Sequence, residues 1–218
     1  MTIFQKLSWL IQMGVYHLCD ERVHSLTQKE QKKPLSLEAL NKELSSSKSS
    51  LSSTATHAIG GVGVIPAQVL CILESPSADE DRSGVALSGT EGELLKKMLN
   101  SVGLDINQQT HVAYLSPWRA PGARTLTNLE IKEGISLLKK RIAVVQPKII
   151  LAFGMPVIKA LTNSTLGQIR SSKSAHYEGI PFCGTFAPSF LIKNPSYKKQ
   201  AWTDLQNFQA RLTELNNH

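Results

Sequence analysis

Short apolar runs and amphipathic stretches alternate along most of this chain. The runs of strand length lie at residues 68–73, 110–115 and 148–153, with a shorter one near 181–186. Apolar residues at helical spacing follow them at 90–102, 127–145, 155–162 and 195–215. Strands that alternate with amphipathic helices are typical of a parallel sheet with helices on both faces. The pattern therefore predicts an α/β fold, a three-layer αβα sandwich with a central four-stranded parallel sheet.

The chain before residue 58 has a different character. Residues 2–25 carry apolar positions at helical spacing, and the tract 45–53 is mostly serine. A serine tract cannot bury a core and is typical of a flexible linker. We therefore expect three parts: an N-terminal helical segment (1–44), a Ser-rich flexible linker (45–57) and one globular domain (58–218).

The loop after the first predicted strand is the richest in chemistry. Leu73 to Gly84 reads LESPSADEDRSG, with a carboxylate at the strand tip (Glu74) and an acidic cluster at 79–81. The loops that follow parallel strands meet at one edge of the sheet, where α/β proteins bind ligands. This loop carries more charge than a simple connection needs, so the sequence predicts a functional site here. The alternative is that Glu74 caps the turn or helix that follows.

Charge and cysteine usage narrow the class of protein. The 218 residues hold 24 Lys and Arg against 17 Asp and Glu, a formal net charge of +7, which favours a polyanionic partner. No apolar run could span a bilayer, and the first helix lacks the features of a signal peptide. Three widely spaced cysteines indicate neither a disulfide framework nor a zinc site. We expect a cytoplasmic, monomeric protein with no membrane or metal partner.

Several segments, in order along the chain, carry a family resemblance. They are LESPSADEDRSG, Arg119-Ala-Pro-Gly-Ala-Arg124 with Thr127-Asn-Leu-Glu-Ile131, Gln146-Pro-Lys-Ile-Ile-Leu-Ala-Phe-Gly154, and Thr185-Phe-Ala-Pro-Ser-Phe-Leu-Ile-Lys193. Between about residues 68 and 208, their order and spacing resemble the uracil-DNA glycosylase superfamily, closest to its bacterial iron-sulphur type (family four). The resemblance implies hydrolysis of the N-glycosidic bond of uracil, or of another damaged base, for base-excision repair. It also implies a partner, uracil-containing or single-stranded DNA, and a place in the bacterial cytoplasm near the nucleoid.

The resemblance also implies roles for individual residues. Glu74 would be the catalytic carboxylate, which orients water and stabilises a cationic sugar as the base departs. The implied base pocket consists of Ser75, Pro76, Ser77, Leu87, Tyr114 and Ala187. The implied DNA contacts are Pro188, Ser189, Lys193, Arg119 and Arg124. For the two arginines, solvated surface charge is an equal alternative.

Several site positions depart from the family pattern. The replaced residues are Leu73 and Ser77 for glycines, Leu87 for a stacking phenylalanine, Tyr114 for the asparagine that reads uracil, and Ala187 for a histidine. A phenol cannot copy the paired donor and acceptor of an amide. The departures therefore predict changed or weakened catalysis on an unchanged fold.

The cysteines that would ligate an iron-sulphur cluster are also replaced. Trp118 and Gly134 stand at the two mid-chain cysteine positions, and the N-terminal part offers only Cys19. A four-iron cluster needs four thiolates, so we expect no cofactor, with packing of Trp118 in its place. Trp202 falls in an apolar helical stripe and is expected in the core.

Three functions remain open from the sequence. The first is a uracil-DNA glycosylase with Glu74 as its carboxylate. The second is a catalytically inactive homologue that binds DNA or a protein through the retained basic loops. The third, a nucleotide- or phosphate-binding domain unrelated to DNA, is disfavoured because no glycine-rich phosphate loop is present. The base pocket separates the first two, since activity requires that Tyr114 and Leu87 leave room for a pyrimidine beside Glu74.

Overall fold

The computed structural model describes residues 37–46, 49–172 and 174–217, so the helix expected at 2–25 and Cys19 lie outside the described residues. The first half contains α3 (Leu37–Ser46), β1 (Val62–Gly63), β2 (Val69–Leu73), α4 (Ala78–Ser83), α5 (Gly89–Asn100), β3 (Thr110–Tyr114) and the 3-10 helix η1 (Pro121–Ala123). The second half contains α6 (Asn128–Val145), β4 (Ile149–Phe153), α7 (Met155–Thr162), α8 (Leu166–Ser171), β5 (His176–Tyr177), β6 (Ile180–Thr185), α9 (Pro188–Lys193), η2 (Pro195–Tyr197) and α10 (Lys198–Asn216). Within these residues, no helix has the length and apolar character needed to cross a membrane.

A six-stranded sheet runs through the described part of the chain, in the order β1-β3-β2-β4-β6-β5. Its central strands β3, β2, β4 and β6 are parallel, which confirms the predicted parallel core. Cys71 in the middle of β2 pairs with Val112 on one side and Leu151 on the other. The sequence did not predict β1 and β5, which pair antiparallel at the two edges, because two residues are too few to show a hydrophobic period.

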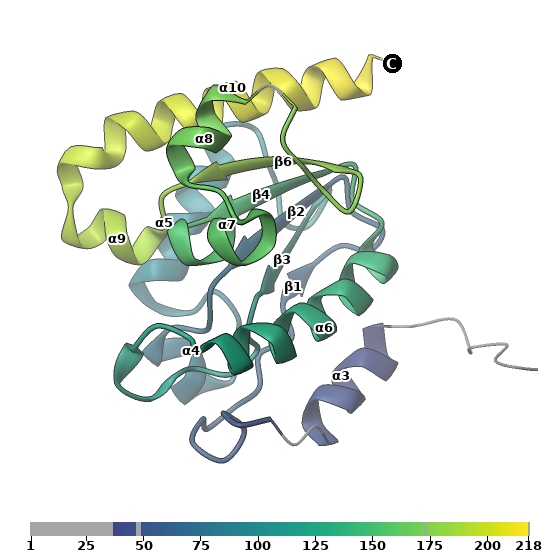
Figure 1. The fold of residues 1–218 in the computed structure, drawn as a ribbon, viewed down its shortest axis with the longest axis vertical. Coiled ribbons are helices and arrows are strands. Elements are labelled where there is room, and N and C mark those ends of the chain that lie inside the picture. The colour runs from purple at the N-terminus through teal and green to yellow at the C-terminus, as the bar shows by residue number, and fades with distance from the viewer. Residues whose placement is uncertain (1–36, 47–48, 173, 218) are drawn as a thin grey trace, which may run out of the picture. The chain divides into compact units, whose positions relative to one another are not determined.

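Helices cover both faces of the sheet, which gives the predicted three layers (Figure 1). Alternate residues of a strand point to opposite faces, so Leu70 and Ile72 join one core cluster while Val69 and Cys71 join the other. The first cluster includes residues of α6, α7 and α8, and the second includes residues of α5, α9 and α10. Burial on both faces explains why the strands read as continuous apolar runs.

Part of the predicted linker contacts the domain. Leu51 is buried in the first core cluster, and the hydroxyl of Ser49 donates to the carboxylate of Glu133 in α6 at 2.7 Å. Next to it, Lys140 of α6 forms an ion pair with Glu43 of α3. The assignment of residues 45–57 as a linker stays a prediction. Within this segment, Leu51 attaches the chain to the core of the domain.

Three local features differ from the sequence predictions. The acidic stretch after β2 forms the short helix α4, and the second motif forms helix α9. The placement of Trp202 in the core was wrong, because its side chain is 41% exposed while the buried stripe of α10 runs through other positions, Ala201, Leu205, Phe208 and Leu212. Helix α4 is too short for an apolar period. A reciprocal capping box between Ser77 and Glu80 defines its start.

Candidate functional site

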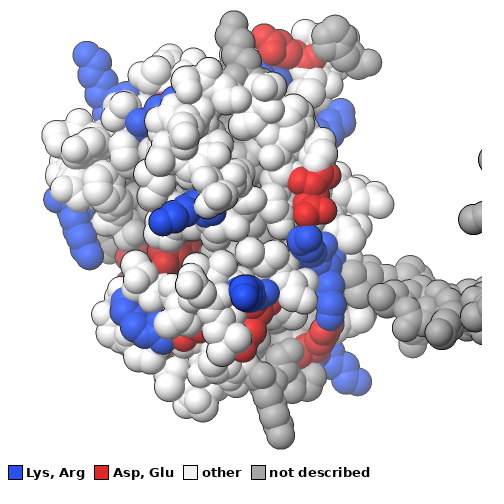
Figure 2. Space-filling view, in the orientation of Figure 1, with Lys and Arg blue, Asp and Glu red and all other residues white. Residues whose placement is uncertain are grey.

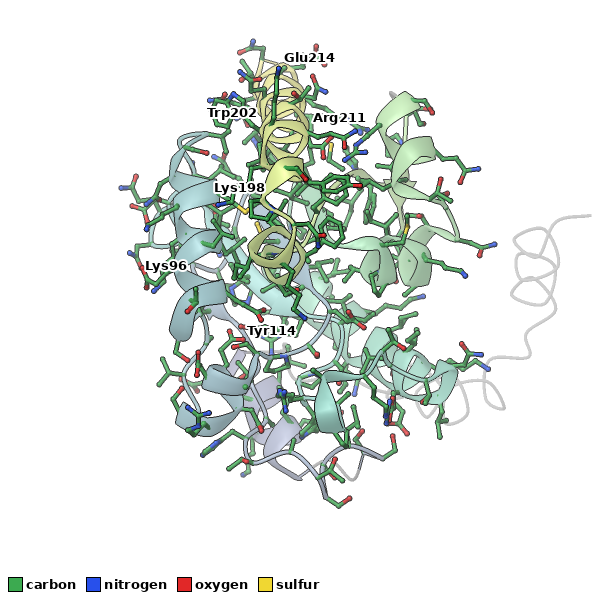
Figure 3. All side chains as sticks on the ribbon, turned by 90° about the vertical axis from the view of Figure 1, so that its left-hand side faces the viewer. Lys96, Tyr114, Lys198, Trp202, Arg211 and Glu214 are labelled. Carbon is green, nitrogen blue, oxygen red and sulfur yellow. The ribbon has the colours of Figure 1, made fainter. Side chains whose placement is uncertain are left out.

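Connections that are far apart in the sequence converge at the carboxyl edge of the parallel strands, the side that faces the viewer in Figure 3. Glu74 follows β2, Tyr114 ends β3, and Pro188 begins α9 after β6. A small cavity at this edge is lined by Leu73, Ser75, Glu80, Leu87, Glu91, Gly92, Leu95 and Pro188. The structure thus brings Ser75, Leu87 and Pro188 together around one space.

Glu74 lies half-buried at the tip of β2. Its Oε1 atom is buried and has no hydrogen-bond partner among the described residues. Burial raises the pKa of this carboxyl group, and a hydrogen bond from the backbone of Leu126 offsets part of the rise. Glu74 does not cap the following helix, because the side chain of Ser77 does. A buried carboxylate oxygen without a protein partner is suited to hold a water molecule.

Glu80, rather than Glu74, is the centre of a hydrogen-bond network at this edge. The Glu80 side chain is buried, and it accepts hydrogen bonds from the backbone N–H groups of Ser77 and Leu87, each at 2.6 Å. The hydroxyl of Tyr114 donates to the same carboxylate. Burial, followed by the charge of Glu80, raises the pKa of Tyr114, so the phenol stays protonated and remains a donor.

The space beside this network is small. The cavity lined by Ser75, Glu80 and Leu87 has a volume of about 20 Å³, which is room for one water molecule. Leu87 and Tyr114 are only 2% and 4% exposed, so both side chains are packed against other atoms. A pyrimidine ring is several times larger than water. Leu87 lines this cavity, and the hydroxyl of Tyr114 bonds to Glu80, which also lines it.

The remaining predicted residues surround this edge. Ser77 caps α4, Pro76 beside it is buried, and Ala187 precedes α9, which begins with Pro188 and Ser189. Lys193 at the end of α9 is exposed, and Arg119 in the loop after β3 is half-buried. Burial raises the pKa of Glu91, with a smaller rise from Glu80, whereas Lys193 and Arg119 lower it. Both cations therefore lie within electrostatic reach of the small cavity that Glu91 lines.

Arg124 is engaged with helix α6. Its guanidinium forms a paired contact with Glu130, Nη1 to Oε2 at 2.8 Å and Nη2 to Oε1 at 2.6 Å. This contact is the main reason that the pKa of Glu130 is lowered to about 2. Glu130 also closes the capping box of α6 with Thr127. A phosphate would have to compete with this arrangement, so a DNA contact from Arg124 stays a prediction.

The surface cations are not gathered into a single patch. Lys and Arg are spread over the face shown in Figure 2, with Asp and Glu between them. At the carboxyl edge, Arg119 and Lys193, and Lys198 and Lys199 at the start of α10, form no ion pair with another described residue. Among the described residues, these four cations have no ion-pair partner that would compete with an external anion.

The residues at the positions of the cluster cysteines do not fit an iron-sulphur cluster. Trp118 is buried in the first core cluster. At Gly134 a Cβ atom would collide with the backbone carbonyl of Leu115, so a cysteine could not stand there without a backbone shift. The described cysteines, Cys71 and Cys183, lie on separate strands, and no group of three or more potential metal ligands occurs among the described residues.

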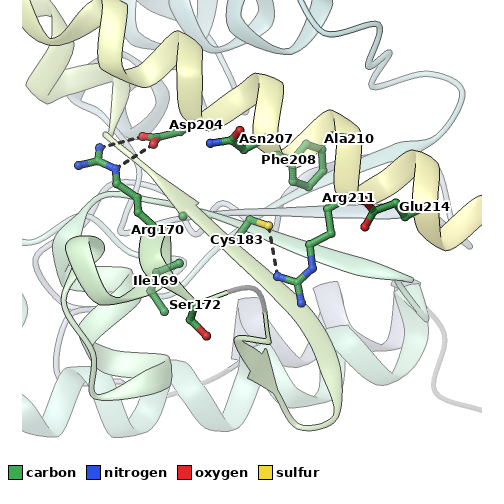
Figure 4. Close-up of a pocket in the computed structure, with 11 residues that line it drawn as sticks. Ile169, Arg170, Ser172, Cys183, Asp204, Asn207, Phe208, Ala210, Arg211 and Glu214 are labelled. Atoms are coloured by element: carbon green, nitrogen blue, oxygen red, sulfur yellow. Dashed lines mark hydrogen bonds and ion pairs between the residues drawn. The ribbon is translucent and has the colours of Figure 1, made fainter.

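A larger cavity, of about 340 Å³, lies between α8, β6 and α10 (Figure 4). Arg170 makes two hydrogen bonds of 2.8 Å to Asp204, which also accepts one from Thr185 at 2.9 Å. Arg211 donates to the backbone carbonyl of Phe182 at 3.0 Å. These bonds tie α10 to α8 and β6, so Arg170, Asp204 and Arg211 already have structural partners.

Sequence reasoning missed Glu80 and Glu91 as residues of the site. Glu80 was included only as one charge in an acidic cluster, although the pattern Ser77-x-x-Glu80 is a capping-box signal that predicts a helix start. The bonds from Leu87 and Tyr114 to Glu80 span 7 and 34 positions in the chain. No local pattern predicts such contacts.

The fold and the site define a class, an α/β sandwich whose polar site lies at the carboxyl edge of the sheet. The model of the Uracil DNA glycosylase superfamily matches residues 61–206, and the chain belongs to this superfamily.

Relatives with known names support the type-4 resemblance. The type-4 uracil-DNA glycosylase of Pyrobaculum aerophilum is 26% identical over 164 residues, 70% of this chain and 82% of that enzyme. That of Sulfurisphaera tokodaii is 28% identical over 176 residues, 75% of this chain and 79% of that enzyme. A DNA polymerase of Bacillus phage SP01 is 29% identical over 152 residues, which are 70% of this chain but only 16% of the polymerase.

Proposed function

We propose that this chain is a DNA-binding member of the superfamily whose base pocket is closed, so that it binds DNA without excising a base. The observation that carries the proposal is the bond between Tyr114 and Glu80. A glycosylase must rotate the target nucleotide out of the stack and into a pocket. The buried phenol bonds to a carboxylate that lines the cavity at this edge, and the size of that cavity, which suits one water molecule, supports a closed pocket.

DNA is the partner that the family and the charge favour. The relatives described above are uracil-DNA glycosylases and a DNA polymerase, which are enzymes that act on DNA. The chain carries a net charge of +7, and the free cations at the carboxyl edge include Arg119 and Lys193. Cations that meet phosphates release counterions, so binding driven by these residues weakens as salt rises.

The test combines binding and excision on the same labelled, uracil-containing single strand. Anisotropy should show binding that Arg119→Ala and Lys193→Ala weaken. Lys148→Ala is the matched control, because this exposed lysine precedes β4 at the opposite edge of the sheet. Alkaline treatment should give no strand cleavage. Absence of binding at low salt would refute a DNA role, and cleavage by the wild type would refute the closed pocket.

Uracil excision is the second candidate, and the unpaired oxygen of Glu74 favours it. A carboxylate with a raised pKa and a free buried oxygen at a strand tip could orient a water toward the sugar and stabilise its positive charge. For a base to enter, Tyr114 would have to swing away from Glu80. This candidate predicts abasic product from the wild type, its loss in Glu74→Ala and Glu74→Gln, and unchanged thermal midpoints in both variants.

A further inference from the structure

Three aromatic side chains around α9 form a compact cluster. The rings of Phe186 and Phe190 are stacked, with centroids 5.1 Å apart and planes inclined by 14°. Tyr197 meets both rings edge-on, with centroids 5.2 Å apart in each case. The guanidinium of Arg170 lies 4.7 Å from the centroid of Phe186 and covers that ring. Arg170 therefore covers the cluster at Phe186, while Phe190 and Tyr197 remain partly exposed.

The other two members of the cluster are unusually exposed. Phe190 is 37% exposed and Tyr197 is 43% exposed, and Trp202 on the next turns of α10 is 41% exposed. These are the aromatic residues among the large exposed apolar side chains of the described chain, and all three lie between residues 190 and 202. Phe190 and Tyr197 contact each other, whereas Trp202 lines a groove with Leu94, Lys97 and Met98 of α5. Exposed aromatic rings in contact with each other are typical of an interaction surface.

The charge of the same stretch has a single sign. Residues 179–203 contain no Asp or Glu, while Lys193, Lys198 and Lys199 lie among the aromatic residues. As noted above, these lysines form no ion pair with another described residue. Figure 3 shows Lys198 and Trp202 together on α10. A partner that covers this surface must therefore offer negative charge beside flat apolar groups.

The surface continues directly from the candidate site. Pro188, the first residue of α9, lines the small cavity, and Lys193 at the end of the same helix acts on the pKa of Glu91. A strand that enters the carboxyl edge therefore reaches Phe190 and Tyr197 within the length of one short helix.

We infer that this surface, made of Phe190, Tyr197, Lys193, Lys198 and Lys199, holds single-stranded DNA by stacking its bases on the rings and binding its phosphates through the lysines. The inference rests on the proposed DNA-binding function and names its substrate class. Single strands present both base faces and a regular line of charge, which aromatic residues interleaved with cations recognise. In a duplex the base faces are hidden in the stack, so the rings would have nothing to contact.

The experiment compares three probes of equal length: a single-stranded oligothymidylate, an abasic single strand with the same phosphates, and a duplex. The wild type should bind oligothymidylate most tightly. Tyr197→Ala and Phe190→Leu should each weaken that binding by about 5- to 150-fold, the range for loss of one stacked base. Neither change should affect the abasic strand, because stacking contributes nothing there. Leu129→Ala, an exposed apolar side chain on α6, is the matched control.

Circular dichroism melting identifies any variant that fails to fold, and Lys198→Glu with Lys199→Glu then tests the same surface without touching the aromatic cluster. Equal binding of the wild type to oligothymidylate and the abasic strand would overturn the inference. Full binding by the Tyr197 and lysine variants, together with weakened binding by Arg119→Ala, would also overturn the inference. That result would leave the proposed function intact and would indicate a protein partner for this surface. Absence of binding to every probe would instead refute the proposed function.

Discussion

At the scale of single residues, the phenol of Tyr114 joins strand β3 to the loop and helix that follow β2. Its hydroxyl donates to Glu80, which also holds the backbone of Leu87. Removal of the hydroxyl in Tyr114→Phe leaves a buried carboxylate with one donor fewer. We expect a loss of about 2 kcal/mol in the free energy of unfolding, the size of a hydrogen bond to a charged group.

Urea denaturation measures this loss, and Tyr177→Phe is its control. The hydroxyl of Tyr177 is buried with no partner among the described residues, so its removal should change stability little or increase it. Equal losses in the two variants would mean that the Tyr114 bond contributes nothing specific.

His111 predicts a pH dependence of stability. Burial, followed by the charge of Arg141, lowers the pKa of this fully buried histidine from 6.5 to about 4. Between these values the unfolded chain binds a proton that the folded chain does not, so stability is full above pH 6.5 and falls as the pH drops toward 4. The loss amounts to about 3 kcal/mol. Urea midpoints at several pH values should show this slope.

The slope should disappear in His111→Gln and persist in His176→Gln, because His176 is exposed. A slope that His111→Gln leaves unchanged would assign the pH dependence to other groups.

At the scale of elements, Gly134 sets how closely α6 packs on the sheet. Because a Cβ atom there would collide with the carbonyl of Leu115, Gly134→Ala should force α6 outward and destabilise the fold by about 1–3 kcal/mol. Gly167 in α8 has open space, with the nearest atom 3.9 Å from a Cβ. Gly167→Ala should therefore stabilise by about 0.5–1 kcal/mol, since alanine favours a helix.

Thermal denaturation of the two variants should give shifts of opposite sign, because a Cβ atom collides with the backbone at Gly134 and not at Gly167. Shifts of the same sign would show that helix propensity alone governs both positions.

The length of an element decided how well the sequence predicted it. Strands β2, β3 and β4 fall within one residue of their predicted ranges, because five buried positions in a row leave a clear apolar run. Helices α4, α8 and α9 have six residues each, which is too short for a helical period. The position of Glu74 followed from the strand before it, whereas the role of Glu80 depends on Leu87 and Tyr114, whose approach only the folded chain creates.

At the scale of the whole molecule, the proposed DNA binding should depend on salt in a defined way. Four free cations lie at the carboxyl edge: Arg119, Lys193, Lys198 and Lys199. Each phosphate contact to a single strand contributes about −0.7 to the slope of log affinity against log salt, so four contacts predict a slope of about −3. Titration of an oligothymidylate at several salt concentrations measures this value.

Neutralising one of these lysines should lower the magnitude of that slope by about 0.7, while Lys148→Ala should not change it. A slope near zero would mean that the carboxyl edge of the sheet does not contact phosphates.

The two-residue strands β1 and β5 have a consequence for the behaviour of the protein at high concentration. A long edge strand exposes a row of unpaired backbone groups, which another chain can extend into an intermolecular sheet. Here the parallel strands β3 and β6 each have an antiparallel neighbour of only two residues. A strand that short offers few backbone groups to a second chain, so we expect β1 and β5 themselves to template little intermolecular sheet.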